Sequence, residues 1–396
     1  MKIQYWGYYV FSVLAVLLFF LEQGEMSKRF GEEEASYSGL NYIIVSMIFL
    51  SGTYIILNKR YLLRTKLKKW FVSTMSVIYV ITVIWSLFYP LASRNTYGYI
   101  LLPIFMFLFM NIITYLMNKM DKIYLICYTM YMIGLLLSAY YFYNYRNNVY
   151  YDIESASNTS YTVLYFLPIM LCVSQKWLRY VAMAIVALAI MLSLKRGGFI
   201  AIIFGVAAYF YISQIKMSGK RIRLGGWLVF VVVGILGYWF IARVNNVLVD
   251  NLMYDRMAMI EETGGSGREN IYKNVINLIG TEHFGYFLFG HGWCGTERDT
   301  FSHLTAHNDF LEVLYDFGII AFVLYILMIV ELFRLTRLLI NIKSEYAPAM
   351  GASLAIFFVN SMVSHIIIYC QYLLIFAMFW GFISGTNKTF KSLLSR

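Results

Sequence analysis

The feature that most constrains this chain is a series of apolar runs, each about as long as a membrane-spanning helix. Crossing the hydrocarbon core takes about 20 apolar residues. About twelve such runs can be counted, at approximately residues 4–22, 39–57, 70–92, 98–117, 123–142, 161–175, 180–194, 198–215, 226–242, 317–333, 347–368 and 371–386. The last two are also compatible with one re-entrant hairpin. The pattern predicts an all-α polytopic membrane protein whose residues 1–396 form a single membrane domain.

The composition agrees with this fold class and excludes others. Of the residues, 60% are hydrophobic and 13% are charged, whereas about a quarter of a soluble domain is charged. The net charge of +11 is not arranged as a basic stripe with stacking aromatics, so nucleic acid is not an expected partner. The four cysteines have no paired spacing that would indicate a disulfide framework.

The lysines and arginines predict the orientation, because cytoplasmic loops retain them. With the amino terminus inside, the cytoplasmic segments contain 21 of the 32 lysines and arginines, and most acidic residues fall outside. The sharpest contrast is between the basic segment 58–70 and Glu32, Glu33 and Glu34 in the preceding outer loop. We therefore expect both termini to be cytoplasmic, and membrane lipids to surround the chain.

The largest segment outside the membrane is then residues 243–316, an extracytoplasmic loop. Within it, Ser266-Gly267-Arg268-Glu269 has the form of a capping box, and apolar residues follow at helical spacing at positions 271, 275, 278 and 279. A second helix is expected to start at His307-Asn308, before the tenth apolar run. The sequence thus predicts amphipathic helices at the outer membrane surface.

The histidines are unevenly distributed. His283, His291, His303 and His307 lie in the long outer loop, and His365 lies near the outer end of a span. Histidine titrates near neutral pH and can accept a proton from a sugar hydroxyl. A loop histidine without a chemical role is the plainer alternative for any one of them. A zinc site on the i, i+4 pair at positions 303 and 307 is not favoured, because no H-E-x-x-H motif accompanies it.

Cations at the outer surface are the second candidate group. Lys195 and Arg196 lie at the outer end of the seventh run, against the retention rule, and two glycines follow them. They are candidates for a phosphate clamp, with contact to lipid headgroups as the alternative. Arg268 lies in the first turn of the expected helix, where free backbone N–H groups favour an anion.

Taken in order, these pieces resemble the O-antigen ligase and O-antigen polymerase superfamily of bacterial envelope glycosyltransferases. The resemblance extends from about Ser193 to Gly318, and the motifs that carry it are Arg196-Gly197-Gly198-Phe199, Ser266-Gly267-Arg268, Phe289-Gly290-His291-Gly292, Ala306-His307-Asn308-Asp309-Phe310-Leu311 and Gly318. In the first half of the chain only the pattern of spans agrees.

The resemblance implies a glycosyltransferase of the bacterial inner membrane whose active site faces the periplasm or the cell exterior. Its donor would be an oligosaccharide linked to undecaprenyl diphosphate, and it would use neither a metal nor another cofactor. Arg196 and Arg268 would stabilise the diphosphate, and His307 would orient or deprotonate the acceptor hydroxyl. Lys195, Asn308 and His291 are the expected substrate-binding residues.

The acceptor is not specified by these motifs. We favour a polymerase of O-antigen or another surface polysaccharide, such as a capsule, that works beside a flippase and a chain-length regulator. The alternatives are an O-antigen ligase that acts on lipid A core, a polysaccharide transporter or flippase, and a structural subunit without activity. The runs contain few charged residues near their centres, which argues against a transporter.

Overall fold

The computed structural model describes residues 66–88, 94–148, 153–193, 195–217, 268–301 and 304–386. All regular elements within these ranges are helices. They are α3 (Lys66–Ser86), α4 (Arg94–Lys119), α5 (Ile123–Asn148), α6 (Ile153–Met170), α7 (Lys176–Leu192), α8 (Arg196–Tyr211) with the π-helical extension η2 (Ile212–Met217), α11 (Arg268–Thr281), α12 (Phe284–Phe289), α13 (Gly295–Asp299), α14 (Asp309–Asn341), α15 (Ala347–Val363) and α16 (Cys370–Ser384).

The apolar runs predicted from the sequence correspond to helices wherever the structure describes them. Runs 4–22, 39–57 and 226–242 lie outside the described residues. Among the described helices, five are long and apolar enough to cross a membrane, and the apolar parts of α6, α15 and α16 are shorter. The class of helical membrane protein is therefore supported, and the number of twelve spans stays a prediction.

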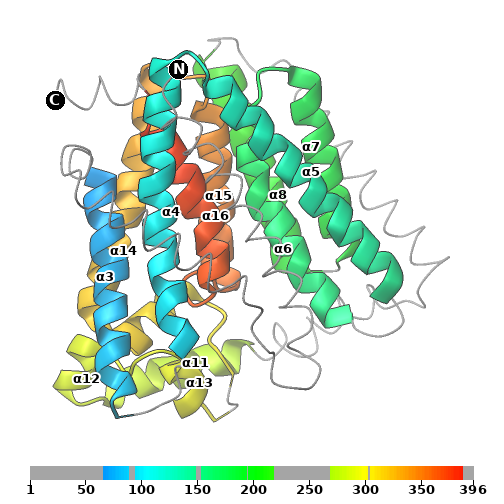
Figure 1. Cartoon of the computed structure of the whole chain (residues 1–396). Helices are drawn as coiled ribbons and strands as arrows, with labels where there is room; N and C mark the ends of the chain where they lie inside the picture. The colour runs from blue at the N-terminus through cyan, green and yellow to red at the C-terminus, as the bar shows by residue number, and fades with distance from the viewer. Residues whose placement is uncertain are drawn as a thin grey trace.

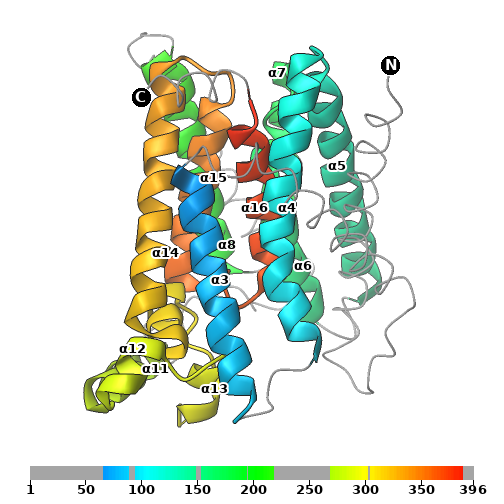
Figure 2. The ribbon, with the colours of Figure 1, turned by 60° about the vertical axis from the view of Figure 1, so that its left-hand side comes forward.

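If successive spans cross the membrane in opposite directions, the helix ends predicted to be outside must lie at the same end of the bundle. Among the described helices, the end of α3 and the starts of α4, α6 and α14 lie at one end of the bundle, where α11, α12 and α13 also lie (Figures 1 and 2). Trp85 near the end of α3 stacks there on Tyr286 of α12, with ring centroids 5.6 Å apart. At the opposite end, Arg179 in the first turn of α7 donates a hydrogen bond of 3.0 Å to Tyr209 Oη near the end of α8. Which end faces the cytoplasm stays a prediction.

Glycines let α16 pack closely on α4. Gly381 and Gly385 lie one turn apart in and just after α16. A Cβ atom on Gly381 would lie 2.3 Å from Phe107 O, and one on Gly385 would lie 2.4 Å from Asn111 O. Small residues four apart allow backbones to approach in membrane helix pairs. A larger residue at either position would separate α16 from α4.

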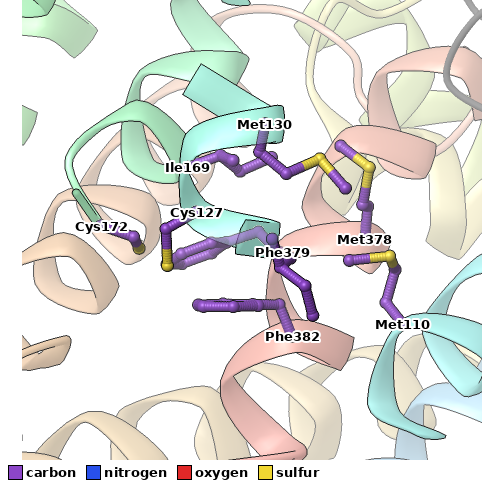
Figure 3. Close-up of a pocket in the computed structure, with 9 residues that line it drawn as sticks. Met110, Cys127, Met130, Ile169, Cys172, Met378, Phe379 and Phe382 are labelled. Atoms are coloured by element: carbon purple, nitrogen blue, oxygen red, sulfur yellow. The ribbon is translucent and has the colours of Figure 1, made fainter. Parts of the chain in front are cut away.

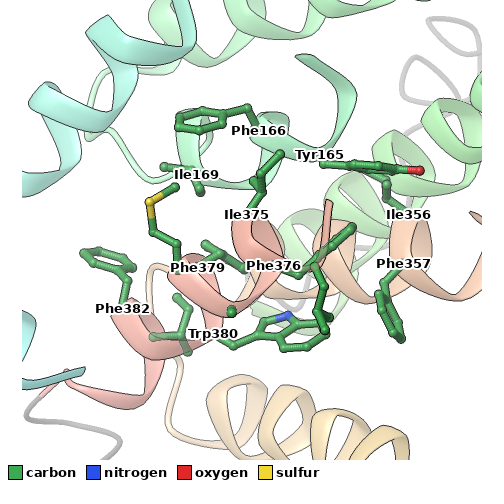
Figure 4. Packing of buried hydrophobic residues seen from close by; sticks show 14 of the residues in the cluster. Tyr165, Phe166, Ile169, Ile356, Phe357, Ile375, Phe376, Phe379, Trp380 and Phe382 are labelled. Atoms are coloured by element: carbon green, nitrogen blue, oxygen red, sulfur yellow. The ribbon is translucent and has the colours of Figure 1, made fainter. Parts of the chain in front are cut away.

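Aromatic side chains fill the centre of the bundle between α6, α15 and α16 (Figure 4). Phe376 and Trp380 of α16 pack on Phe357 of α15, with ring centroids 5.2 Å and 5.1 Å apart respectively. The buried Trp380 indole donates to Ser353 Oγ at 3.1 Å, which satisfies its N–H group. This part of the core is dry and tightly packed, so it provides a scaffold and no reactive groups.

A small pocket between α4, α5, α6 and α16 is also apolar. Methionine, cysteine and aromatic side chains line it (Figure 3), among them Met130, Cys127 and Cys172. Cys127 is in the second turn of α5 and Cys172 directly follows α6, so the pocket lies toward the end of the bundle opposite α11–α13. Its lining offers no group for transfer chemistry.

The tenth run differs from its prediction in one respect. We expected a surface helix starting at His307-Asn308 and then a separate span at 317–333. The structure has one element, Asp309–Asn341, with non-helical backbone at Gly318 (φ 73°, ψ 177°). The part after Gly318 is about 34 Å long at 1.5 Å per residue, which suffices to cross the hydrocarbon core. The break therefore divides α14 into a short part at the α11–α13 end of the bundle, called the outer part after its predicted side, and a longer part that is the candidate span.

Candidate functional site

The helix starts that carry the sequence motifs converge at one end of the bundle. Arg268, the first residue of α11, donates from Nη1 to Val363 O at 2.6 Å. A Cβ atom on Gly197, in the first turn of α8, would lie 3.1 Å from both Val363 Cγ2 and Tyr161 Oη. Two motifs that are far apart in the sequence thus contact the same residue at the end of α15.

His307 lies directly before the N-cap of α14. Its φ of 51° is in the left-handed region, which is uncommon for a residue with a side chain. The buried Glu312 carboxylate holds this conformation, because its Oε1 accepts a hydrogen bond of 2.9 Å from the His307 N–H. The His307 ring stacks on the His365 ring, with centroids 4.6 Å apart and planes at 24°.

The electrostatic environment keeps the His307 imidazole neutral. Burial is the main reason that the pKa of His307 falls to about 3, and the charges of His365, Arg268 and Lys195 lower it further. Burial likewise lowers the pKa of His365 to about 4, with Asp309 acting in the opposite direction. At neutral pH both rings are therefore uncharged, and the His307 ring keeps a nitrogen lone pair that can accept a hydrogen bond from a hydroxyl group, while its low pKa makes it a weak base.

Arg268 and Lys195 supply positive charge to this site. Both act electrostatically on His307 and on His365. Lys195 is at the N-cap position of α8, and thus lies between α7 and α8 as the sequence predicted. Arg196 is the first residue of α8, and the prediction for its side chain lies outside the described part of the structure. Two of the three predicted cations are therefore placed beside His307.

Asn308 is the N-cap of α14. Its Oδ1 accepts from the N–H groups of Phe310 and Leu311 at 3.0 Å and 3.2 Å. Its Nδ2 donates to Met362 O at 3.1 Å, which links α14 to the end of α15. The predicted start of a helix at this point is confirmed. The side chain has a structural role, and its contact with substrate stays a prediction.

His291 belongs to a separate cluster. Its ring lies between Tyr286 and Tyr315, with centroids 4.7 Å and 4.3 Å away. Its Nε2 is 2.9 Å from Glu282 Oε1, and its Nδ1 is 3.6 Å from Asp299 Oδ2. None of these ring contacts involves the residues around His307, so the structure does not bring His291 together with the other predicted site residues. Its contact with substrate also stays a prediction.

The glycine motifs fix the position of α14 relative to α12. Gly318 (φ 73°) would place a Cβ atom 2.3 Å from Leu288 O, and Gly290 (φ 69°) would place one 2.3 Å from Asp316 O. The break at Gly318 leaves two carbonyl groups of α14 without helical partners. The N–H groups of residues 291 and 292 bind these carbonyls, at positions 315 and 316, at 3.1 Å and 2.7 Å. The Gly290–Gly295 turn thus has an architectural role.

The predicted helix after Arg268 is present as α11. Glu269 is in its first turn, while Ser266 and Gly267 of the expected capping box lie outside the described residues. Ile271 and Val275 are buried on the expected apolar face. That face packs on Ala306 and Tyr315. The predicted helix start at Arg268 is therefore confirmed, and the structure shows that this helix packs beside α14.

Sequence reasoning missed two contributors to the site. It did not connect Glu312 with the site, and it singled out His365 only for its position near a span end. The acidic residue in the first turn after an N-cap is a usable signal for Glu312. No local pattern links His365 to His307. Among the described residues, no group of three His, Cys, Asp or Glu side chains is arranged to hold a metal ion, and His303 lies outside them.

Comparison with known proteins supports the resemblance read from the motifs. A search of curated proteins found no match. A family model described as O-antigen ligase matches residues 181–326. This range contains Arg196, Arg268 and His307, and it ends before His365. The match over residues 181–326 thus supports a relationship of this part of the chain to the O-antigen ligase and O-antigen polymerase superfamily.

Proposed function

We propose that the protein is a surface-polysaccharide polymerase. It transfers a glycan from an undecaprenyl-diphosphate carrier to a hydroxyl of a carrier-linked repeat unit, at the outer face of the bacterial inner membrane. The observation that carries the proposal is the convergence of His307 with Arg268 and Lys195 at one end of the helix bundle. A neutral proton acceptor beside fixed cations is the arrangement that transfer from a diphosphate carrier needs.

In this reaction, the acceptor oxygen forms a bond to the anomeric carbon of the donor glycan. The bond from that carbon to the diphosphate oxygen breaks, and the carrier diphosphate leaves with additional negative charge. His307 takes the proton of the acceptor hydroxyl. Arg268 and Lys195 stabilise the charge on the leaving diphosphate, and Arg196 is proposed to act with them. No metal is needed for this step.

The guanidinium of Arg268 retains capacity for a ligand. Its hydrogen bond to Val363 O uses Nη1, and this is its only hydrogen bond to another described residue. We propose that Nε and Nη2 bind phosphate oxygens in the forked geometry of arginine. The bond to Val363 also fixes the side chain before substrate arrives, so less conformational freedom is lost on binding.

The placement of buried acids favours an enzyme over a transporter. Asp309, Glu312 and Asp316 are fully buried, and all three precede the break at Gly318. They lie at the outer end of α14, where they organise loops. A transporter places such groups near the membrane midplane. Glu331 is the exception among the described residues, because it is buried near the middle of the span beyond the break, and Arg334 one turn later in the same helix neutralises it.

The test is complementation in a bacterial strain that lacks the native gene. His307→Ala and Arg268→Ala are compared with His283→Ala and Arg337→Ala, which change an exposed histidine and an exposed arginine away from the site. All variants are first checked for normal abundance in membranes. We expect the first two to abolish assembly of long surface glycan and the controls to retain it.

The products separate the possible functions. Loss of a polymerase leaves glycans of a single repeat unit attached to the cell surface, whereas loss of a ligase leaves long chains on the carrier. Loss of a transporter leaves carrier-linked repeats on the cytoplasmic side. Normal long surface glycan with both His307→Ala and Arg268→Ala would refute the assignment of the site.

A further inference from the structure

A second histidine lies directly against His307. The His365 ring stacks on the His307 ring at 4.6 Å, and on its other side it stacks on the Tyr369 ring at 4.5 Å. The planes are at 24° and 22° to that of His365, so each neighbouring ring is stacked on it. The His307 side chain is thus supported on one face by a planar partner.

The loop that carries His365 is held by the same residues that build the site. Asp309 Oδ1 accepts hydrogen bonds from the N–H groups of Ile366 and Ile367, at 2.8 Å and 3.1 Å. The bonds of Arg268 and Asn308 to the carbonyls of residues 363 and 362 tie down the preceding residues. Four hydrogen bonds therefore fix the position of a loop that is more than 50 residues from His307 in the sequence.

The His365 ring itself has polar contacts that limit its rotation. Thr305 Oγ1 is 3.4 Å from its Nδ1, and Glu312 Oε1 is 3.6 Å from the same nitrogen. Glu312 Oε1 is also the acceptor for the His307 N–H group. One buried carboxylate oxygen thus faces the backbone of the first histidine and the ring of the second. Glu312 thus helps to position both the His307 backbone and the His365 ring, and so the two rings relative to each other.

We propose that His365 is a positioning residue for His307: its ring is the fixed surface on which the His307 imidazole stacks in the orientation needed to accept the acceptor's proton. The proposal rests on the proposed function. It follows from the geometry, because an unsupported His307 side chain would rotate about two bonds and lose alignment. A misplacement of about 1 Å at a reacting group can lower a rate by a factor of about 100.

The test replaces His365 by Phe, Leu and Ala in the full-length protein. Phe retains a planar ring and loses both nitrogens, whereas Leu has a similar bulk without a plane. The purified variants are added to membranes of the deletion strain, which hold the accumulated lipid-linked repeat units, and the initial rate of polymer formation is measured. The amount of membranes added sets the concentration of lipid-linked repeat units. Initial rates measured over a range of this concentration give kcat and KM separately.

We expect His365→Phe to retain a kcat within about threefold of the parent, whereas His365→Leu and His365→Ala lose at least about tenfold. KM for the lipid-linked repeats should stay unchanged, because His365 acts on alignment and does not bind the carrier. Variants are compared at equal abundance and equal thermal unfolding midpoint. The control is His283→Phe, a matched exchange at an exposed histidine.

Two results would overturn the proposal while the proposed function stands. In the first, His365→Leu and His365→Ala are as active as the parent, so His365 has no role. In the second, His365→Phe is as inactive as His365→Ala, so stacking is not what matters. Full activity of His307→Ala in the same assay would instead refute the proposed function, and the positioning role with it.

Discussion

The junction between α12 and α14 allows one prediction to be worked out in detail, for the substitution Gly318→Ala. The backbone of Gly318 (φ 73°, ψ 177°) is in a region that only glycine adopts readily. This conformation costs about 1 to 3 kcal/mol for alanine. The new methyl group would also meet Leu288 O at 2.3 Å, so the two backbones must separate by several tenths of an ångström at least.

The separation would weaken the hydrogen bonds from the His291 and Gly292 N–H groups to the carbonyls at positions 315 and 316. Each contributes about 1 kcal/mol. Together with the backbone strain, we expect the junction to lose about 3 to 5 kcal/mol. A loss of about 3 kcal/mol raises the population of locally open states by roughly a hundredfold. Because His307 lies in the loop that enters α14, activity should fall as well.

The assay is amide hydrogen exchange of the purified protein in detergent, followed over residues 284–301. The matched control is Gly280→Ala in α11, where a Cβ atom would meet no atom within 4 Å. That change should stabilise its helix slightly, because alanine has the higher helix propensity. Equal exchange rates for Gly318→Ala and the parent over residues 284–301 would refute the reasoning.

Three further predictions concern the residues around His307. Arg268→Ala should lower activity about a hundredfold, and Arg268→Lys should recover only part of it because lysine lacks the fork; initial rates of polymer formation check both. Asn308→Ala should lose a helix cap and the bond to Met362, together about 2 kcal/mol, and should speed amide exchange in the first turn of α14, whereas Asn308→Asp keeps the cap. Folded His307 and His365 resist protonation, with pKa values of about 3 and 4, whereas an unfolded imidazole takes up a proton near pH 6.5. Their contribution to stability is therefore complete above pH 6.5 and falls as the pH drops toward 4; the parent should lose more of its thermal unfolding midpoint between pH 8 and pH 5 than a variant with phenylalanine at both positions.

The features predicted correctly from the sequence are those that local physics determines. Asn308 caps a helix because its short side chain reaches the free N–H groups of the next turn. Ile271 and Val275 are buried because their spacing puts them on one helix face. Both signals lie within a few residues, so no tertiary information is needed to read them.

The pairing of His365 with His307 could not be predicted in this way. It depends on hydrogen bonds from the α15–α16 loop to Asp309, whose partners are 57 and 58 residues away in the sequence. A single sequence contains no sign of such long-range contacts. The same reason explains why the sequence grouped His291 with the substrate-binding residues, while the structure places its ring between Tyr286 and Tyr315.

The outer part of α14 explains why so many acidic residues are buried in a membrane protein. Burying an ionised carboxylate is costly, so burial raises the pKa of Asp309 to about 7 and that of Glu312 to about 8. Hydrogen bonds to one oxygen of each acid offset part of this cost. Asp309 accepts from the α15–α16 loop, Glu312 accepts from the His307 N–H group, and Asp316 Oδ1 accepts from Thr296 N at 2.7 Å and Thr296 Oγ1 at 2.6 Å.

Each of these carboxylates thus holds one irregular segment against the helix. Buried irregular backbone is tolerated only where its polar groups find partners. The short helix before Gly318 supplies these partners for three segments at once. Changes to it should therefore disturb the candidate site around His307 without disturbing the longer part of α14 beyond Gly318.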